Sequence, residues 1–530
     1  MKLKILVSDP LGEKGVSILK KEKSLQVDVV TGLKEEELKK IIGQYDAIVV
    51  RSATKLTKNV LEEAKKLRVI GRAGVGVDNV DLEAATKQGI IVMNTPEGNT
   101  ISTCEHTWSM LMAVARNIPQ ANQSVKKGEW ARTKFTGSEL HGKVLGVVGL
   151  GRIGCQIVAR ALVFGMQSIG YDPYISKDSL RQSGITLVSL EELLERSNFI
   201  TVHVPLTDQT KNLIGVKEFN RMQKGVYIIN CARGGIVDEK ALCDAIVSGK
   251  VRGAALDVFE QEPPRNNPLL ALDQVITTPH LGAATEEAQE NVAVAVAQQV
   301  ADALFDRGIK DAVNVPSLDA ESFKVLRPWI NLAERMGRFY TQFFEGSFKK
   351  VTIRYGGEVT KYKLEPLTIA VLKGLLTPIC GETVNFVNAP TLARERSIEV
   401  NESRTTQIGD FSNFIELEVE VNGDRNTVLG TLFGDHDPRI VRINEFRLDA
   451  VPTGVVLVIH NEDRPGVVGQ LGTILGKNKI NIAEMTLGRV TKGKKTFALT
   501  VINTDNDIPP KVLKELKAFK PIIDAKVVKL

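Results

Sequence analysis

Cysteine is scarce in this chain of 530 residues: five occur, spread between positions 104 and 380. They form no CxxC pair and are odd in number, so neither a disulfide framework nor a zinc site is expected. Aromatic residues make up 5% of the chain, while hydrophobic residues reach 43% and charged residues 25%. This composition predicts a globular protein of roughly three or four domains, with free thiols and no bound metal.

Long apolar runs and a strong excess of charge are also missing. No apolar run approaches the roughly 20 residues that a membrane-spanning helix needs, and the opening MKLKILVSDP predicts a short first strand rather than a signal peptide. The 69 basic and 63 acidic side chains give a net charge of +6, spread along the chain. A nucleic-acid-binding protein would concentrate basic charge on one element. We therefore expect a cytoplasmic protein that binds neither membranes nor nucleic acids.

Short apolar runs alternate with amphipathic stretches up to about residue 279. This rhythm predicts parallel sheets covered by helices on both faces. The strands of a first sheet are expected at residues 4–8, 47–50 and 90–93, and those of a second at 143–149, 199–204, 226–229 and 254–258. Helices are expected at residues 33–42, 60–67 and, as one long helix, 101–127.

The later part of the chain completes the predicted fold class, which is α/β with two doubly wound parallel-sheet domains, followed by an α+β domain and a ferredoxin-like domain. A helical pattern over residues 286–307 could cross back to the first domain and make it discontinuous, and the last ~80 residues read β-α-β-β-α-β. The predicted bounds are 1–98 with 284–316, then 99–283, 317–450 and 453–530.

A glycine-rich turn, Gly149-Leu150-Gly151-Arg152-Ile153-Gly154, follows the apolar strand KVLGVV and opens an apolar helix. Gly149 permits the tight turn, Gly151 lets the backbone approach a pyrophosphate, and Gly154 lets helix and strand pack closely. Asp172 ends the next strand, at about the 20-residue interval where an acidic side chain accepts hydrogen bonds from an adenosine ribose. Because its charge would repel a 2′-phosphate, the sequence predicts a Rossmann domain that binds NAD rather than NADP.

Histidine is the natural acid or base for an alcohol dehydrogenation, because its pKa lies near working pH. The chain has six histidines. His280, in TTPHLGAAT, follows an apolar strand, and ligands of open α/β sheets bind at such strand ends. His203, in TVHVPL, also follows a strand. Position alone leaves both residues as candidates.

Two further strand ends supply groups that suit a hydroxyacid. Arg233, in NCARGG, follows the strand VYII, and its guanidinium could hold a carboxylate at two points. Asp257 and Glu262, in DVFEQEPP, follow the strand GAAL. Because the carboxyl ends of parallel strands meet at one edge, Arg233, Glu262 and His280 are expected to converge.

The segments NCARGGIVDE, ALDVFEQEPP and TPHLGAAT closely resemble the signatures of the D-2-hydroxyacid dehydrogenases. The resemblance implies that Arg233 binds the α-carboxylate and the carbonyl oxygen. It implies that His280 accepts a proton in oxidation and that Glu262 hydrogen-bonds and orients it. Asp257 and the run His280-Leu281-Gly282-Ala283 resemble the segments that line the nicotinamide.

The same resemblance implies further contacts with the cofactor. The residues are those of the glycine turn, Gly149, Gly151, Arg152, Ile153 and Gly154, together with Val75, Asp172, Val204, Cys231 and Ala232. Val75 and Val204 stand where relatives often carry threonine, so one or two cofactor hydrogen bonds are expected to be missing.

Two N-terminal stretches resemble the substrate loops of family members that act on 3-phospho-D-glycerate. In RSATK, Arg51 and Lys55 supply positive charge and Ser52 a donor; in GRAGVGVDN, Arg72 supplies charge and the Gly74 backbone a donor. The implied reaction is NAD-dependent oxidation to 3-phosphooxypyruvate, the first step of L-serine biosynthesis. The alternatives are a glyoxylate, hydroxypyruvate or D-lactate dehydrogenase, or an NAD-sensing transcriptional corepressor that would lack an amino-acid module.

The C-terminal unit, with HNEDRPGVVG after its first strand, resembles an ACT domain. The resemblance implies that Asn461, Asp463 and Asn481 bind an amino acid, with L-serine as the expected feedback inhibitor. Such sites form between two ACT domains, so a homo-oligomer, either dimer or tetramer, is expected. Residues 317–450 resemble the intervening domain of long family members, and no chemistry is predicted there.

Overall fold

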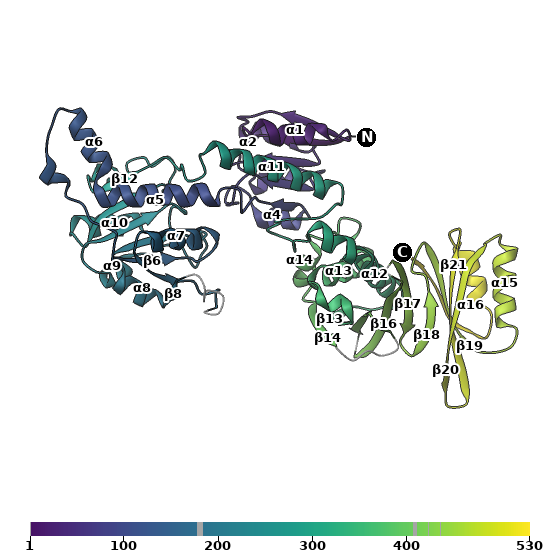
Figure 1. Cartoon of the computed structure of the whole chain (residues 1–530). Coiled ribbons are helices and arrows are strands. Elements are labelled where there is room, and N and C mark those ends of the chain that lie inside the picture. Colours follow the sequence, from purple (N-terminus) through teal and green to yellow (C-terminus); the bar gives the residue numbers. More distant parts are fainter. Residues whose placement is uncertain (1, 177–183, 406–410, 422, 435) are drawn as a thin grey trace.

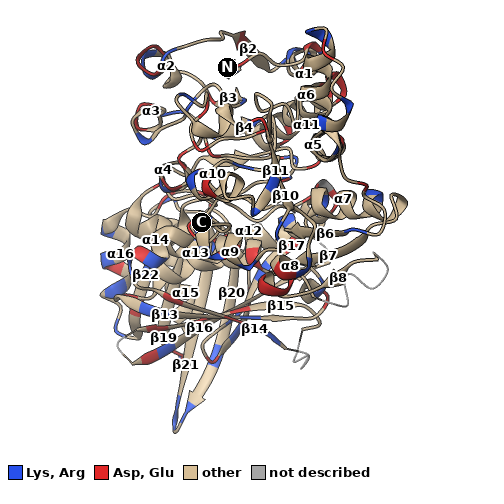
Figure 2. Ribbon diagram, turned by 90° about the vertical axis from the view of Figure 1, so that its left-hand side faces the viewer, with Lys and Arg blue, Asp and Glu red and all other residues tan. Residues whose placement is uncertain are grey.

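The computed structural model describes residues 2–176, 184–405, 411–421, 423–434 and 436–530. Within them the chain forms four sheets along an elongated molecule (Figure 1). The second sheet lies at one end, the first sheet beside it, and the third and fourth sheets toward the other end. Basic and acidic residues are interspersed over the ribbon (Figure 2). No described helix is both long and apolar enough to cross a membrane.

The first sheet has five parallel strands in the order β2-β1-β3-β4-β5. The strands are β1 (Leu3–Val7), β2 (Leu25–Val29), β3 (Ala47–Val50), β4 (Val69–Arg72) and β5 (Ile91–Met93). Helices α1 (Glu13–Lys21), α2 (Glu35–Ile42), α3 (Lys58–Glu62) and α4 (Leu82–Lys87) alternate with them. All four residues of β3, AIVV, are buried, as expected of a parallel strand covered on both faces.

Helix α11 (Glu286–Leu304) returns to this first sheet, as its sequence pattern suggested. Its Val292, Val296 and Val300 pack in one core with residues of β1, β3 and β4. Gly71 of β4 permits the close approach, because a Cβ there would lie 2.5 Å from Val300 Cγ2.

The second sheet has seven parallel strands in the order β12-β11-β10-β9-β6-β7-β8. They are β6 (Val144–Val148), β7 (Gln167–Tyr171), β8 (Thr186–Leu187), β9 (Phe199–Val202), β10 (Val226–Asn230), β11 (Val251–Leu256) and β12 (Val275–Thr277). The intervening helices include α7 (Arg152–Val163), α8 (Leu190–Arg196), α9 (Val216–Arg221) and α10 (Glu239–Val247). The strand order reverses between β6 and β9, and ligands of doubly wound sheets bind at this point.

The single helix expected over residues 101–127 is wrong: the structure has two helices there, α5 (Thr100–Arg116) and α6 (Ile118–Lys126). Asn117 separates them in the left-handed conformation, with φ 53°. Asparagine tolerates that conformation better than most residues, and Pro119 in the first turn of α6 has no N–H to continue α5. The uninterrupted helical pattern of the side chains concealed this backbone break.

The third sheet is mixed and has the order β14-β13-β15-β16-β17-β18. It is formed by β13 (Phe348–Gly356), β14 (Glu399–Thr405), β15 (Phe414–Val421), β16 (Asp424–Phe433), β17 (Asp437–Ile443) and β18 (Phe446–Ala450), with α12 (Ala320–Phe343), α13 (Glu365–Cys380) and α14 (Ala389–Glu395).

The fourth sheet is antiparallel, with the ferredoxin-like order β20-β21-β19-β22. It is formed by β19 (Val455–Glu462), β20 (Ile482–Lys492), β21 (Lys495–Thr504) and β22 (Ile522–Lys529), with α15 (Val467–Lys477) and α16 (Pro510–Lys517) on one face. Its other face buries Val458, Val501 and Val528 in the core that contains α12 and the third sheet. The two C-terminal sheets therefore form one packed unit.

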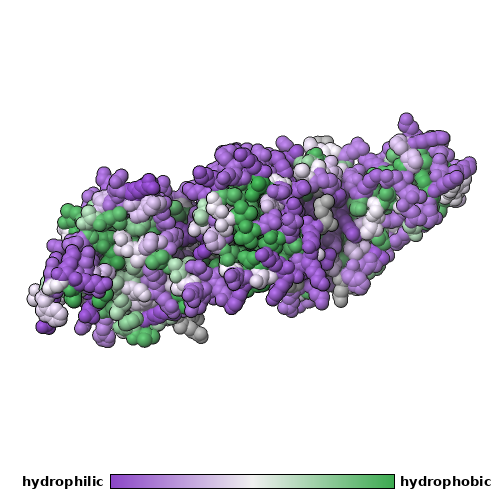
Figure 3. All heavy atoms as spheres, turned by 90° about the horizontal axis from the view of Figure 1, so that it is seen from above, coloured by the Kyte–Doolittle hydropathy of each residue, from purple (hydrophilic) through white to green (hydrophobic). Residues whose placement is uncertain are grey.

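Exposed hydrophobic residues are unevenly distributed over the face seen from above (Figure 3). They gather over the part of the molecule that the first two sheets form, while the C-terminal part is mostly hydrophilic. Trp130, after α6, is 80% exposed, and Ile118 and Val125 of α6 are more than half exposed.

Candidate active site

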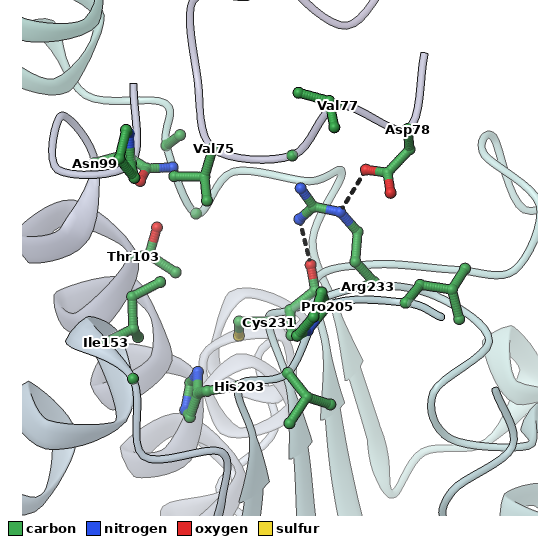
Figure 4. A pocket seen from close by; sticks show the side chains of 18 of the residues that line it. Val75, Val77, Asp78, Asn99, Thr103, Ile153, His203, Pro205, Cys231 and Arg233 are labelled. Carbon is green, nitrogen blue, oxygen red and sulfur yellow. Dashed lines mark hydrogen bonds and ion pairs between the residues drawn. The ribbon is translucent and has the colours of Figure 1, made fainter. Parts of the chain in front are cut away.

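A cleft of about 750 Å³ separates the loop after β4 from the carboxyl ends of the second sheet (Figure 4). It is lined by most of the predicted cofactor and catalytic residues: Val75, Gly151, Arg152, Ile153, Val204, Cys231, Ala232, Arg233, Asp257, His280, Gly282 and Ala283. Of the residues predicted to bind substrate from the two N-terminal loops, Arg51, Ser52, Arg72 and Gly74, the cleft is lined by Arg72. The predicted convergence of strand ends is therefore seen as one cavity.

The glycine turn has the geometry that a dinucleotide requires. Gly149 adopts φ 94°, which only glycine holds without strain. A Cβ on Gly154 would lie 2.1 Å from the carbonyl oxygen of Gly149, whereas a Cβ on Gly151 would meet nothing within 4 Å. The turn thus packs tightly on its inner side and is open on its outer side, at the start of α7, where a pyrophosphate fits.

Asp172 directly follows β7, beside this turn. Its carboxylate accepts hydrogen bonds from the backbone N–H of Leu150 and of Tyr174, both at 2.9 Å. These bonds fix the carboxylate next to the glycine turn. Asp172 is not among the residues that line the cleft itself, and its contact with a ribose stays a prediction.

His280 and Glu262 form a hydrogen-bonded pair. Nδ1 of His280 lies 2.9 Å from Oε2 of Glu262, so Nε2 is the ring nitrogen left for a substrate. Burial raises the pKa of Glu262, but the hydrogen bonds from His280 and from the backbone N–H of Phe259, together with the charge of Arg233, outweigh it and hold the pKa below its usual value. The carboxylate therefore stays ionised beside the imidazole.

The side chain of Asp257 is fully buried and fastens the loop that carries His280. Its carboxylate accepts hydrogen bonds from Thr278 Oγ1 at 2.6 Å and from the N–H groups of Leu281 at 2.7 Å and Gly282 at 2.9 Å. His106 Nε2 lies 3.1 Å from the same carboxylate. Burial raises the pKa of Asp257, but these donors lower it further than burial raises it. An ionised Asp257 thus fixes the left-handed backbone of His280, whose φ is 57°.

His203, the rival candidate, also lines the cleft, but it has no carboxylate partner among the contacts described. Its Nε2 lies 2.9 Å from Thr201 Oγ1. Burial lowers the pKa of His203 to about 4, so the imidazole would hold a proton poorly near neutral pH. This geometry favours His280 over His203 as the proton-transfer group.

Arginine side chains dominate the charge of the cleft. Arg233 Nε donates to Asp78 Oδ2 at 2.9 Å, and its Nη1 donates to the carbonyl oxygen of Ala232 at 2.7 Å (Figure 4). Burial, the charge of Arg233 and that of Arg51 lower the pKa of Arg72 to about 10. The charges of Arg233 and Arg51 thus both oppose the charge of Arg72, and a bound anion would relieve that repulsion.

Other predicted substrate residues lie outside the cleft lining. Ser52 and Lys55 are exposed, and the backbone of Arg51 is held by Asp9, whose Oδ2 accepts its N–H at 2.6 Å. The N–H of Gly74 donates to Thr95 Oγ1 at 2.7 Å, inside the protein. Their contact with a substrate stays a prediction.

The predicted serine-binding residues are not brought together within one chain. Asn461 is buried near the end of β19 and donates to the carbonyl oxygen of Glu462 at 2.8 Å, while its Oδ1 has no described partner. Asp463 pairs with Arg489. Asn481 precedes β20, at the opposite end of the sheet, since Ile482 and Val455 both align with Thr504. A site using all three needs a second copy.

Two residues that hold the active site, Asp78 and His106, are not predicted from the sequence. Asp78 was part of a predicted substrate loop without a role of its own, and His106 was simply one of six histidines. His106 lies one helical turn after Ser102, whose hydroxyl donates to the carbonyl oxygen of Gly282 at 2.8 Å. Ser102 and His106 are four residues apart and therefore lie on one face of the helix, and this spacing is the sequence signal that could have indicated His106.

Comparison with known proteins agrees with this geometry. The NAD-binding domain of D-isomer specific 2-hydroxyacid dehydrogenases matches residues 108–282, the D-3-phosphoglycerate dehydrogenase intervening domain residues 325–444, and the ACT domain residues 455–520. The D-3-phosphoglycerate dehydrogenase of Methanocaldococcus jannaschii is 46% identical over 529 residues, covering 100% of both chains. The chain belongs to the D-3-phosphoglycerate dehydrogenase family. The Archaeoglobus fulgidus member is 44% identical, again over 100% of both chains.

A solved structure outside the D-3-phosphoglycerate dehydrogenase family shows the shared catalytic fold. D-lactate dehydrogenase from Aquifex aeolicus, complexed with NAD and lactic acid, is 30% identical with a TM-score of 0.52, and the match covers 59% of this chain and 100% of that one. The full-length match to the D-3-phosphoglycerate dehydrogenases includes the intervening and ACT domains, which the lactate and corepressor alternatives do not explain. NAD is the cofactor, and the chain is an NAD-dependent oxidoreductase.

Proposed function

We propose that this protein oxidises 3-phospho-D-glycerate to 3-phosphooxypyruvate with NAD, the first step of L-serine biosynthesis. The observation that carries the proposal is the juxtaposition of Arg72 and Arg233 with the His280–Glu262 pair in one cleft. A substrate with a carboxylate at one end and a phosphate at the other needs two positive groups beside a proton acceptor. D-Lactate, which has no phosphate, would leave the repulsion among Arg51, Arg72 and Arg233 unrelieved.

Each residue has a proposed part in the reaction. Arg233 holds the carboxylate and the developing carbonyl oxygen, and Arg72, with Arg51 behind it, attracts the phosphate. Nε2 of His280 accepts the hydroxyl proton, while the Glu262 carboxylate orients the ring and stabilises the charge that it gains. The glycine turn, Gly149 to Gly154, and Asp172 would hold NAD, which would supply the hydride acceptor for the substrate carbon.

The proposal is tested by following NADH formation with 3-phosphoglycerate, D-glycerate and D-lactate. D-Glycerate keeps the carboxylate and hydroxyl but lacks the phosphate, so it is the matched control. Losing one charged hydrogen bond should lower kcat/KM about 10–150-fold. Arg72→Leu should cause a similar loss with 3-phosphoglycerate and little change with D-glycerate. Equal activity on all three acids would contradict the proposed substrate.

The C-terminal part is proposed to bind L-serine and to regulate the enzyme. The support is the match to the ACT domain, together with the buried Asn461 and its unpartnered Oδ1. Because Asn481 lies at the far end of the sheet, the site would form between two copies. The exposed Trp130, Ile118 and Val125 offer a second surface for association. A cytoplasmic homo-oligomer, dimer or tetramer, is therefore proposed; light scattering with and without serine tests it.

The domain division also stays a proposal. Residues 1–98 with 284–316 would bind the substrate, 99–283 would bind NAD, 317–450 would intervene, and 453–530 would regulate. The packing of α11 on the first sheet supports the discontinuous first domain. Limited proteolysis should cut first between residues 1–316 and the C-terminal part, because residues 317–450 and 453–530 share one core.

A further inference from the structure

Asp78 lies in the loop between β4 and α4 and meets Arg233 from the opposite wall of the cleft. The 2.9 Å contact from Nε to Asp78 and the bond from Nη1 to the carbonyl oxygen of Ala232 use two of the three guanidinium nitrogens. In Figure 4, Asp78 lies on one side of Arg233, and Val75 and Asn99 lie on the other. The ion pair therefore leaves Nη2 as the nitrogen with no part in either contact.

The charge of Asp78 also acts on the neighbouring arginine. Arg233 and Arg51 lower the pKa of Arg72, while Asp78 and Asp9 raise it. Asp78 thus offsets the repulsion between Arg72 and Arg233, which come from different walls of the cleft. Without an acidic residue here, two guanidinium groups would oppose the closing of the cleft on a substrate.

The backbone next to Asp78 is shaped to this contact. A Cβ on Gly76 would lie 1.7 Å from Arg233 Nη2 and 2.6 Å from Asp78 Oδ2. A side chain there would push into both partners of the pair. The absence of one at position 76 lets the loop bring Asp78 against Arg233.

We propose that Asp78 is a positioning residue for carboxylate binding: by accepting from Nε of Arg233 across the cleft, it aims the remaining nitrogen, Nη2, at the hydroxyacid carboxylate. Because the two partners belong to different walls, the aim is correct only when the cleft is closed. This inference rests on the proposed role of Arg233 as the carboxylate-binding residue. It adds a residue from the first sheet to a grip otherwise made by the second.

The test compares Asp78→Ala, Asp78→Asn and Gly76→Ala with the wild-type enzyme in steady-state kinetics. Asp78→Ala should raise the KM for 3-phosphoglycerate about tenfold, the lower end for a charged hydrogen bond because Asp78 is 57% exposed. Asp78→Asn keeps an oxygen acceptor, so its KM should lie between those of the wild-type enzyme and Asp78→Ala. Gly76→Ala should raise the KM about as much as Asp78→Ala. The dissociation constant for NAD should not change, and Asp244→Asn, at an exposed position on α10, is the matched control.

Combining the variants decides between positioning and an independent effect. In an Arg233→Ala background, Asp78→Ala should cause no further loss, since its effect passes through Arg233. Additive losses, an unchanged KM, or a lower KM in the Asp78 variants would overturn the inference. If Arg233→Ala itself keeps normal kinetics, the proposed role of Arg233 fails; if Arg233→Ala is impaired and the Asp78 variants are not, the positioning role alone fails.

Discussion

Replacing His280 by alanine should stop proton transfer while leaving the cofactor site intact. The imidazole is held by Glu262 through Nδ1 at 2.9 Å, and its loop is fastened by the buried Asp257. Without it, the proposed acceptor of the hydroxyl proton is gone. General acid–base catalysis contributes about 10²–10⁴-fold, so turnover of His280→Ala should fall by that factor. NAD should still bind, because the glycine turn lies on a different strand end.

Removing the charge of Glu262, the partner of His280, should cause a smaller loss of turnover. Glu262→Gln keeps the size of the side chain but removes the charge that stabilises a protonated His280. A hydrogen bond to a charged group is worth about 1.5–3 kcal/mol, and with side chains 44% and 40% exposed the lower end applies, or roughly a tenfold loss of turnover. Because the pKa of Glu262 is lowered from 4.5, the carboxylate stays charged as the pH falls below 4.5, and its charge is lost only as the pH falls through the lowered pKa.

His203→Ala supplies the matched control, since His203 lines the same cleft. Its pKa of about 4 keeps the ring neutral at working pH, so turnover should change far less than in His280→Ala. Initial rates of NADH formation at saturating NAD measure both variants, and calorimetric titration checks cofactor binding. Near-normal turnover in His280→Ala, with a large loss in His203→Ala, would refute the assignment.

Variants at the glycine turn, at Asp172 and at Asp463 test the cofactor site and the regulatory site. Gly151→Ala should fold normally but weaken NAD binding roughly tenfold or more. Gly154→Ala should instead lower the free energy of unfolding by about 1–3 kcal/mol, because its Cβ would lie 2.1 Å from a carbonyl oxygen. Equal melting temperatures of the two variants would contradict this contrast. Asp172→Ala should narrow the preference for NAD over NADP, and a wild-type enzyme that used both equally would contradict the placement of Asp172. Asp463→Ala should weaken serine binding about 10–150-fold in calorimetry on the full chain; an unchanged affinity would exclude this carboxylate from the site.

The sheets and their strand ends could be predicted because parallel strands leave a strong signal. Most of these strands are short apolar runs, and the residue types that carry chemistry come soon after them, as His280 comes three residues after β12. Strands β2, β4 and β8 are not predicted from the sequence, because they are very short or interrupted by polar residues or glycine. The side chains that hold those groups gave no such signal. Asp78 and His106 act through contacts with residues 155 and 151 positions away in the chain, and only the three-dimensional arrangement shows such pairs.

The break at Asn117 shows a different limit. The sequence of residues 101–127 has a helical pattern on both sides of Asn117, although α5 buries nine of its residues and α6 only Ser124. One residue with φ 53° was enough to separate α5 from α6. Backbone conformation at a single asparagine depends on the small cost of the left-handed region, which periodicity does not measure.

The arrangement of the two halves indicates where an effector could act. The third and fourth sheets share one core, so the ACT domain and residues 320–450 should move as one body. Among the described contacts, this body meets the first sheet where α14 lies against α4, with Asn385 Nδ2 donating to the carbonyl oxygen of Gly89 at 2.9 Å. Helix α4 directly follows the loop of Asp78, whereas the His280 loop is fastened by α5 and Asp257 beside the second sheet. A displacement caused by serine should therefore alter cleft closure and the carboxylate grip before it alters the proton acceptor.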